Sequence, residues 1–278
     1  MAAPWTRLET VVLRDRDAVV ALAPSRGGLV TRFDVGDRPV LFLDESTLLD
    51  PSKNVRGGVP VLFPSPGALA AGRFRRGDAA GSMAQHGFAR QRPWAVAARG
   101  ARDVTLALES DEVTRAQYPW DFALTLDYAL RGARLRIAQR VVNRGATAMP
   151  FAMGFHPYFH VPDGEKARAA VATAARRAFD NTSKATVTLD GPIDLTRAEV
   201  DLHLDEHATL ALADGSRVVV MASAEYRRWV VWTLAGKDFV CLEPWTAPAD
   251  ALNTGDGLLV LEPGESRDLW VEIALVVA

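Results

Sequence analysis

Two histidines in this chain have residue types and surroundings that suit proton transfer. His86 lies in the segment QHGFAR and His156 in the segment GFHPYF, so aromatic and small residues flank each ring. A histidine titrates close to neutral pH and can donate or accept a proton in catalysis. The same surroundings also fit a core histidine whose ring bonds to a backbone carbonyl. The residue types alone leave both interpretations open.

Glu243 is the carboxylate that would complete such chemistry. It lies in the segment DFVCLEPW at residues 238–245, where strand alternation places Phe239, Cys241 and Glu243 on one face. Both faces are apolar, so the carboxylate is expected to be partly buried, where its pKa rises and it becomes a better base. The alternative is a buried acid that pairs with an arginine. Glu262 has a similar sequence context, but a turn follows it and we assign it no chemistry.

Two arginines lie in segments rich in glycine, proline and aromatic residues. Arg56 opens the segment RGGVPVLFP, and Arg90 closes QHGFAR. A guanidinium group in such a place can hold a sugar hydroxyl or a phosphate. It can also pair structurally with Glu243 or Asp180, and the residues do not decide between these roles. His203 and His207, in the polar stretch DLHLDEH, are predicted to be solvated surface residues.

The elements that must position these residues are predicted to be β-strands. Apolar residues alternate with polar or small ones at 104–108, 122–130, 135–141 and 269–275, and Arg131-Gly132 marks a hairpin between the second and third of these runs. Helical periods are scarce, and residues 165–177 fit a helix or a strand equally well. We therefore predict an all-β sandwich or barrel, formed as a single domain over residues 1–278.

Three segments interrupt the strand pattern and contain the candidate residues. They are rich in glycine, proline, aromatic residues and isolated polar groups, and they span residues 54–94, 151–161 and 239–256. Loops and strand ends held by a rigid sheet commonly carry binding and catalytic groups. We expect the site to lie in segments of this kind.

Composition excludes several classes of function. The 278 residues contain 32 Lys+Arg and 34 Asp+Glu, a net charge of -2, which gives no electrostatic reason to expect nucleic acid or a membrane as partner. The single cysteine, Cys241, excludes an internal disulfide and any CxxC metal site. The first 13 residues lack a continuous apolar core, so we expect no signal peptide, no membrane span and a cytoplasmic protein.

Four ordered motifs resemble the aldose 1-epimerase (mutarotase) family, most closely its hexose-6-phosphate epimerase branch. They are NVRGGVPVLFP at 54–64, QHGFARQRPW at 85–94, GFHPYF at 154–159, and CLEPW at 241–245 followed by NTG at 253–255. The resemblance implies a galactose-mutarotase-like β-supersandwich of antiparallel strands and a reaction without cofactor or metal. The expected partner is a small-molecule sugar or sugar phosphate, and the expected state is a monomer or weak homodimer.

The resemblance also implies roles for individual residues. Glu243 and His156 would be catalytic. Arg56, His86 and Arg90 would bind the substrate. The family's hydroxyl-binding aspartate lies between the second histidine and the glutamate, and the best match to it is Asp180 in FDN.

Anomer exchange needs the two catalytic groups that the resemblance supplies. The hemiacetal opens when the C1 hydroxyl loses a proton while the ring oxygen gains one, so a general base and a general acid must stand at adjacent oxygens. Glu243 suits the base and a charged His156 suits the acid. Arg56 and Arg90 would bind a phosphate if the substrate carries one.

Two other functions remain as alternatives. A non-catalytic carbohydrate-binding protein could use the same pocket, although it would need no proton donor and acceptor. A metal-dependent β-sandwich enzyme could use His86, His156 and Glu243 as ligands. No two of these three residues share a short metal-binding spacing.

Overall fold

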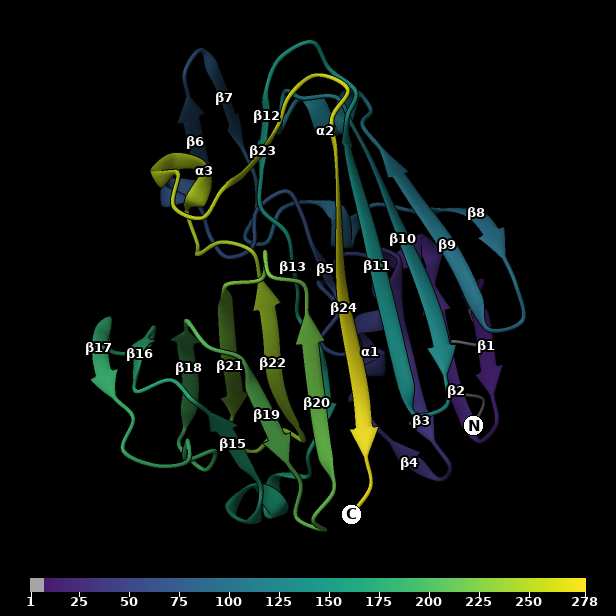
Figure 1. Cartoon of the computed structure of the whole chain (residues 1–278), viewed down its shortest axis with the longest axis vertical. Helices are drawn as coiled ribbons and strands as arrows, with labels where there is room; N and C mark the ends of the chain where they lie inside the picture. The colour runs from purple at the N-terminus through teal and green to yellow at the C-terminus, as the bar shows by residue number, and fades with distance from the viewer. Residues whose placement is uncertain (1–7) are drawn as a thin grey trace.

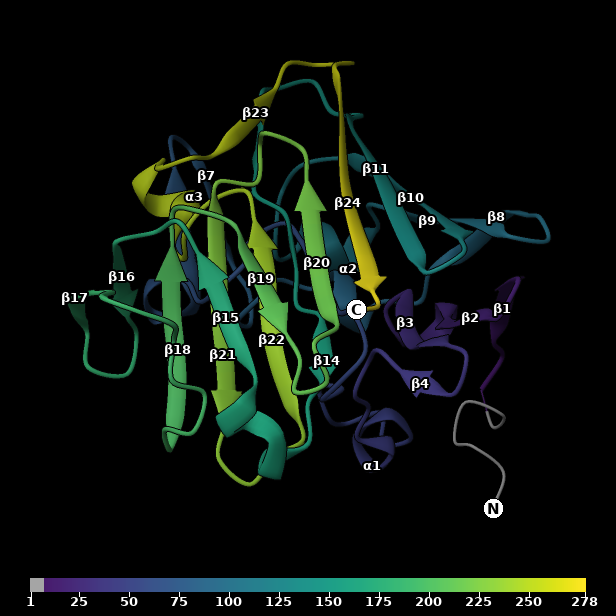
Figure 2. The ribbon, with the colours of Figure 1, turned by 60° about the horizontal axis from the view of Figure 1, so that its bottom comes forward.

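The computed structural model describes residues 8–278. Its main body consists of two large antiparallel sheets, with one packed against the other (Figures 1 and 2). This confirms the predicted all-β class. The prediction that the first 13 residues are not a signal peptide falls partly on residues outside the described range. Among residues 8–278, no helix has the length and apolar character needed to cross a bilayer.

The first large sheet contains the strands with the clearest alternation. The predicted hairpin is confirmed, with Phe122 opposite Asn143 and Arg131 opposite Arg134. Leu124, Leu126 and Tyr128 point into the core and are fully buried, and each such side chain contributes roughly 1.5–3 kcal/mol on burial. The order of strands is β15 (Ala170–Thr173), β19 (Ala208–Ala211), β20 (Arg217–Ala222), β24 (Ser266–Val276), β11 (Arg134–Asn143), β10 (Phe122–Arg131), β9 (Asp103–Glu109) and β8 (Ala95–Arg99).

The second large sheet carries the site. It includes Glu243 on a strand that is buried along its whole length. Strand β14 (Tyr158–His160) pairs with that same strand, so the GFHPYF and CLEPW motifs become neighbours. The order is β17 (Ala185–Thr188), β16 (Arg177–Asp180), β18 (Glu199–Leu204), β21 (Arg228–Leu234), β22 (Phe239–Trp245), β13 (Gly154–Phe155) and β5 (Val61–Leu62).

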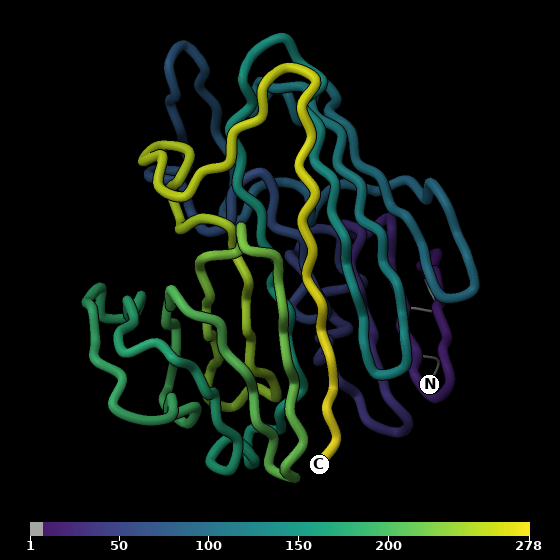
Figure 3. The backbone as a smooth tube through the Cα atoms, viewed as in Figure 1, coloured from purple at the N-terminus to yellow at the C-terminus, as the bar shows by residue number. Residues whose placement is uncertain are grey.

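Smaller elements surround the two sheets. Figure 3 follows the chain from an N-terminal sheet at one side to the long last strand beside β11. That N-terminal sheet contains β1 (Val11–Asp15), β2 (Ala18–Ala23), β3 (Leu29–Val35) and β4 (Arg38–Pro39), and two further ladders pair β6 (Arg73–Arg76) with β7 (Ala79–Ser82) and β12 (Met149–Phe151) with β23 (Leu259–Leu261). The helices are single turns at α1 (Glu45–Leu48), α2 (Glu112–Arg115) and α3 (Ala251–Thr254), with 3-10 turns at Pro24–Arg26, Ala70–Gly72, Ala89–Gln91 and Asp163–Arg168.

The ambiguous segment 165–177 is resolved as a mixture of both predicted forms. A 3-10 turn over Asp163–Arg168 leads into β15, and the chain then enters β16 at Arg177. Its alanines suit either form, so the partner strands decide. Ala170–Thr173 finds β19 as its neighbour and extends the first large sheet.

Candidate active site

The three loop-rich segments meet around a cavity of about 500 Å³ on the second large sheet. Strands β18, β21 and β22 form its floor, and loops at 54–68 and 85–90 form its rim. The residues that line it include Asn54, Arg56, Gly67, His86, Arg90, His156, Tyr158, Asn181, Lys184, Glu199, Asp201, His203, Trp232, Glu243 and Trp245. The structure therefore brings together five of the six predicted site residues.

Glu243 lies at the floor of the cavity with 2% of its surface exposed. Its Oε1 atom is 3.3 Å from Nε2 of His156. Its Oε2 atom accepts a hydrogen bond of 3.1 Å from the indole nitrogen of Trp245. Trp245 is two residues further along β22, so strand alternation puts both side chains on one face.

His156 lies between β13 and β14 and is fixed on several sides. Its backbone nitrogen donates to the carbonyl of Pro60 at 3.1 Å. Its ring stacks on Tyr158, with centroids 4.6 Å apart and planes 10° apart, and the edge of Trp232 meets it at 5.6 Å. Its buried Nδ1 atom has no hydrogen-bond partner among the described residues. The ring is therefore oriented by packing, and Nε2 is the atom that faces Glu243.

Burial acts on both members of this pair in favour of their neutral forms. It raises the pKa of Glu243 well above its usual value, and the nearby Asp201 carboxylate adds to that shift. Burial also lowers the pKa of His156 to about 3, assisted by Arg90. A neutral imidazole beside a protonated carboxyl holds as many protons as an imidazolium–carboxylate pair, which is one more than a neutral imidazole beside a carboxylate. The pair therefore shares one transferable proton between two adjacent atoms.

His86 lies in a left-handed backbone conformation with φ of 72°. Gly87 follows it, also at positive φ, and passes so close to Phe63 that a β-carbon there would lie 2.2 Å from the Phe63 carbonyl oxygen. The backbone nitrogen of Gly67 donates to Nδ1 of His86 at 3.0 Å. Because burial keeps the pKa of His86 well below its usual value, the ring is neutral and its proton sits on Nε2.

Arg56 and Arg90 stand on the same side of the cavity. The guanidinium of Arg56 lies 5.4 Å from the ring centre of Trp232. Arg90 donates to the backbone carbonyl of Gln85 at 2.8 Å, and its buried Nε has no partner among the described residues. Burial lowers the pKa of Arg90, with the neighbouring Arg56 adding to the effect. Neither arginine forms a salt bridge to Glu243 among the described residues, so the structural pairing considered above is not observed.

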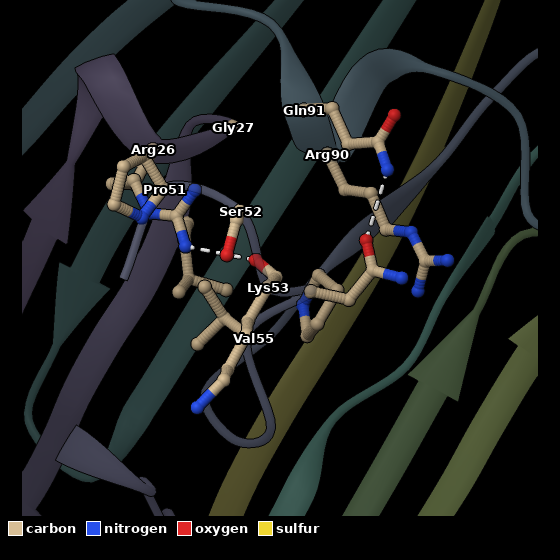
Figure 4. A pocket seen from close by; sticks show the side chains of 11 residues that line it. Arg26, Gly27, Pro51, Ser52, Lys53, Val55, Arg90 and Gln91 are labelled. Carbon is tan, nitrogen blue, oxygen red and sulfur yellow. Dashed lines mark hydrogen bonds between the residues drawn. The ribbon is translucent and has the colours of Figure 1, made fainter. Parts of the chain in front are cut away.

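Arg90 also borders a smaller pocket of about 70 Å³ (Figure 4). Arg26 is committed there to backbone carbonyls, including those of Leu48 and Lys53 at 3.0 and 3.1 Å. The side-chain amide of Gln91 donates a hydrogen bond to Oδ1 of Asn54. In Figure 4 the guanidinium of Arg90 points away from Arg26, so this small pocket is part of the loop scaffold rather than a second cationic site.

Asp180 is the predicted site residue that does not line the cavity. One carboxylate oxygen accepts from the backbone and hydroxyl of Thr182, and the other accepts from Arg197 at 2.9 Å. Both oxygens are therefore occupied by a turn and an ion pair. The aspartate that lines the cavity in its place is Asp201, on the neighbouring strand β18.

His203 and Asp201 are two of the cavity residues that the sequence analysis missed. The structure places His203 in the cavity wall with its side chain 12% exposed and its Nε2 atom 3.2 Å from Asp201, so its prediction as a solvated residue was wrong. His207 is exposed, as predicted. The alternation Val200, Leu202, Leu204 was the available signal, because it puts Glu199, Asp201 and His203 together on the opposite face.

Among the described residues, one group of side chains has the spacing of metal ligands. It comprises His156, Cys241 and Glu243, whose ligand atoms lie within 4.8 Å of one another. His86 is not part of this group. The ligand set considered in the sequence analysis therefore differs from the one that the fold assembles.

Comparisons with known proteins identify the family and the fold of the chain. A family model described as aldose 1-epimerase matches residues 9–274. A protein of Cenchrus ciliaris named "Putative glucose-6-phosphate 1-epimerase" is 26% identical over 276 residues, covering 92% of this chain and 78% of that protein. The solved Slr1438 protein from Synechocystis sp. PCC 6803 is 37% identical with a TM-score of 0.94, covering 98% of this chain and 97% of the other.

A more distant solved structure confirms the predicted architecture. A galactose mutarotase-like protein from Lactobacillus casei ATCC 334 has a TM-score of 0.80 at 21% identity, covering 96% of this chain and all of the other. The antiparallel supersandwich is thus the galactose-mutarotase-like fold. With the family model matching almost the whole length, the chain belongs to the aldose 1-epimerase family.

Proposed function

We propose that this protein interconverts the α and β anomers of a hexose or hexose 6-phosphate, with Glu243 and His156 as the catalytic pair. The observation that carries the proposal is the 3.3 Å contact between Oε1 of Glu243 and Nε2 of His156 at the floor of the cavity. The two oxygens that exchange a proton in anomerisation are bonded to the same carbon. An acid and a base that serve them must therefore also lie side by side.

The reaction uses the one proton that the pair holds. One member takes the proton of the C1 hydroxyl while the other gives a proton to the ring oxygen, and the ring opens to the aldehyde. Rotation about the C1–C2 bond presents the other face of the carbonyl. The two groups then exchange roles as the ring closes. The cycle can start with the shared proton on either residue. The protonation state of the pair after ring opening is the state from which ring closure begins.

The surrounding groups suit the charge that develops at C1. His86 presents a fixed Nε2–H, because Gly67 occupies its other nitrogen. The unpaired Nε of Arg90 supplies a second buried donor. Preorganised donors in a buried site stabilise a developing oxyanion without reorganising during the reaction. We assign both residues to orientation and charge stabilisation.

The cavity is lined by charges of both signs. Arg56, Arg90 and Lys184 are the cations, and β18 contributes the carboxylates of Glu199 and Asp201. A phosphate dianion would be attracted to the arginines and repelled by the carboxylates, whereas sugar hydroxyls suit Asp201 and His203. This polarity favours a phosphorylated hexose held in one orientation.

The test is an anomerisation assay over matched pairs of free and 6-phosphorylated hexoses, followed by NMR exchange or a coupled anomer-specific dehydrogenase. We expect kcat/KM for the phosphorylated hexose to exceed that for the free hexose by about a hundredfold, equivalent to roughly 2.7 kcal/mol. Sulfate should compete. Equal efficiency without sulfate inhibition would remove the phosphosugar assignment and leave a general mutarotase.

Variants at two glutamates test the catalytic assignment itself. Glu243→Gln should lower kcat by roughly two orders of magnitude or more, as expected for the loss of a general base. Glu262→Gln, in the similar but exposed Leu-Glu-Pro string, should match the wild type. Turnover by folded Glu243→Gln at the wild-type rate would refute the assignment.

A further inference from the structure

Cys241 is a buried thiol directly beside the catalytic pair. It precedes Glu243 by two residues on the same face of β22 and is fully buried. The ligand atoms of Cys241, Glu243 and His156 all lie within 4.8 Å of one another. Cys241 is not among the residues that line the cavity, so it stands behind the pair rather than in contact with substrate.

These three donors form a set that suits a thiophilic cation. Zinc binds thiolate, imidazole and carboxylate at about 2.0–2.3 Å in tetrahedral geometry, which puts neighbouring donor atoms roughly 3.3–3.8 Å apart. The Glu243–His156 contact of 3.3 Å already meets that spacing. The remaining atoms need to move by only about 1 Å to do so. The fourth position would face the cavity.

The charges of such a complex also balance. A divalent cation bound by the Cys241 thiolate, the Glu243 carboxylate and a neutral His156 has no net charge, which suits a buried site. Binding would release the thiol proton and the proton that the pair holds, both to solvent.

We propose that Cys241, Glu243 and His156 form an inhibitory site for a thiophilic divalent cation such as zinc or cadmium. Occupancy takes up the lone pairs of Glu243 and His156 that proton transfer requires, and so stops anomerisation. This site differs from a resident metal centre. A histidine that binds a resident metal usually donates its other nitrogen to a supporting acceptor, whereas Nδ1 of His156 has no hydrogen-bond partner among the described residues.

Absorbance titration with cadmium tests binding without any use of activity. The chain has one cysteine, so a thiolate–cadmium charge-transfer band in the ultraviolet reports this residue alone. We expect the band to saturate at one equivalent in the wild type and to weaken in His156→Asn. Absence of the band in the folded wild type would overturn the proposal, whatever the outcome for the enzymatic function.

Inhibition by zinc provides the second test, which rests on the proposed function. Zinc should inhibit the wild type, EDTA should restore activity, and magnesium at the same concentration should have no effect. Cys241→Ala should keep the basal rate and raise the half-inhibitory zinc concentration at least about tenfold. Cys241→Ser provides a second variant, with circular dichroism to check folding of both. Unchanged zinc sensitivity in the folded variants would contradict the proposal.

Discussion

At the scale of single residues, the proposed catalytic pair of Glu243 and His156 lowers the stability of the folded protein. A buried carboxyl with a raised pKa and a buried imidazole with a lowered pKa are both displaced from their preferences in water. Active sites commonly hold groups in such states because the reaction needs them there. Substitutions at these two positions should therefore separate stability from activity.

Glu243→Gln should be more stable than the wild type at neutral pH although it is inactive. In the unfolded chain the glutamate ionises above about pH 4.3, whereas burial keeps the folded carboxyl protonated to higher pH. The wild type therefore loses stability as pH rises through that range, and the neutral amide does not. Melting temperatures at pH 4 and pH 8 measure the effect, at about 2–4 °C per kcal/mol. A difference that shrinks between pH 4 and pH 8 would contradict the raised pKa.

His156→Asn should be nearly as damaging to turnover as Glu243→Gln. The asparagine can still hydrogen-bond to Glu243, but it cannot accept and return a proton, so kcat should fall by roughly two orders of magnitude or more. His207→Ala is the matched control, because that histidine is exposed. It should change stability by less than about 0.5 kcal/mol and leave steady-state rates unchanged. Loss of activity in His207→Ala alone would mean that the wrong histidine was chosen.

At the scale of elements, strand register and loop contacts place the proposed catalytic groups. The pairing of Tyr158 with Cys241 in the β14–β22 ladder fixes the His156 loop against the Glu243 strand. Gly87 fixes the loop that carries His86. Its close approach to Phe63 lets the backbone nitrogens of Phe88 and Ala89 donate to the Phe63 carbonyl.

Gly87→Ala should therefore destabilise the protein more than a comparable glycine substitution elsewhere. A β-carbon at Gly87 would lie 2.2 Å from the Phe63 carbonyl oxygen, whereas at Gly77 it would meet nothing within 4 Å. Both glycines have positive φ, so Gly77→Ala controls for backbone strain. Denaturant unfolding should show about 1–3 kcal/mol more destabilisation for Gly87→Ala. Equal effects would show that the close approach does not matter.

At the scale of the whole molecule, two neutral buried histidines make the folding free energy depend on pH. The unfolded chain protonates both below about pH 6.5. The folded protein resists, since burial lowers the pKa of His156 to about 3 and that of His86 well below its usual value. Each histidine should lower stability by up to about 1.4 kcal/mol per pH unit as pH drops below 6.5, and the raised pKa of Glu243 offsets part of this loss because its contribution has the opposite sign.

Chemical unfolding at pH 7, 6 and 5 measures this dependence. His156→Asn removes one of the two groups and should make the pH dependence shallower, while His207→Ala should leave it unchanged. A wild-type slope no steeper than that of His156→Asn between pH 6 and pH 5 would show that His156 titrates normally in the folded state.

The sequence by itself determined the β class and the hairpin of β10 and β11, and its resemblance to a known family made Glu243 and His156 the candidate pair. Period-two alternation is a local property, and it survives in the structure because the apolar face of each strand needs a core. The ordered motifs likewise indicated which loops place polar side chains in apolar surroundings.

Only the tertiary structure decided which strand faces meet at the cavity. Asp180 and Asp201 are both aspartates on strands of the second sheet, yet Asp180 is held by Thr182 and Arg197 while Asp201 lines the site. His203 was predicted to be solvated because the stretch DLHLDEH contains several charged residues. Cys241 gained metal-ligand spacing to His156 only through the β14–β22 pairing. These outcomes depend on contacts between residues distant in sequence, which a local pattern does not contain.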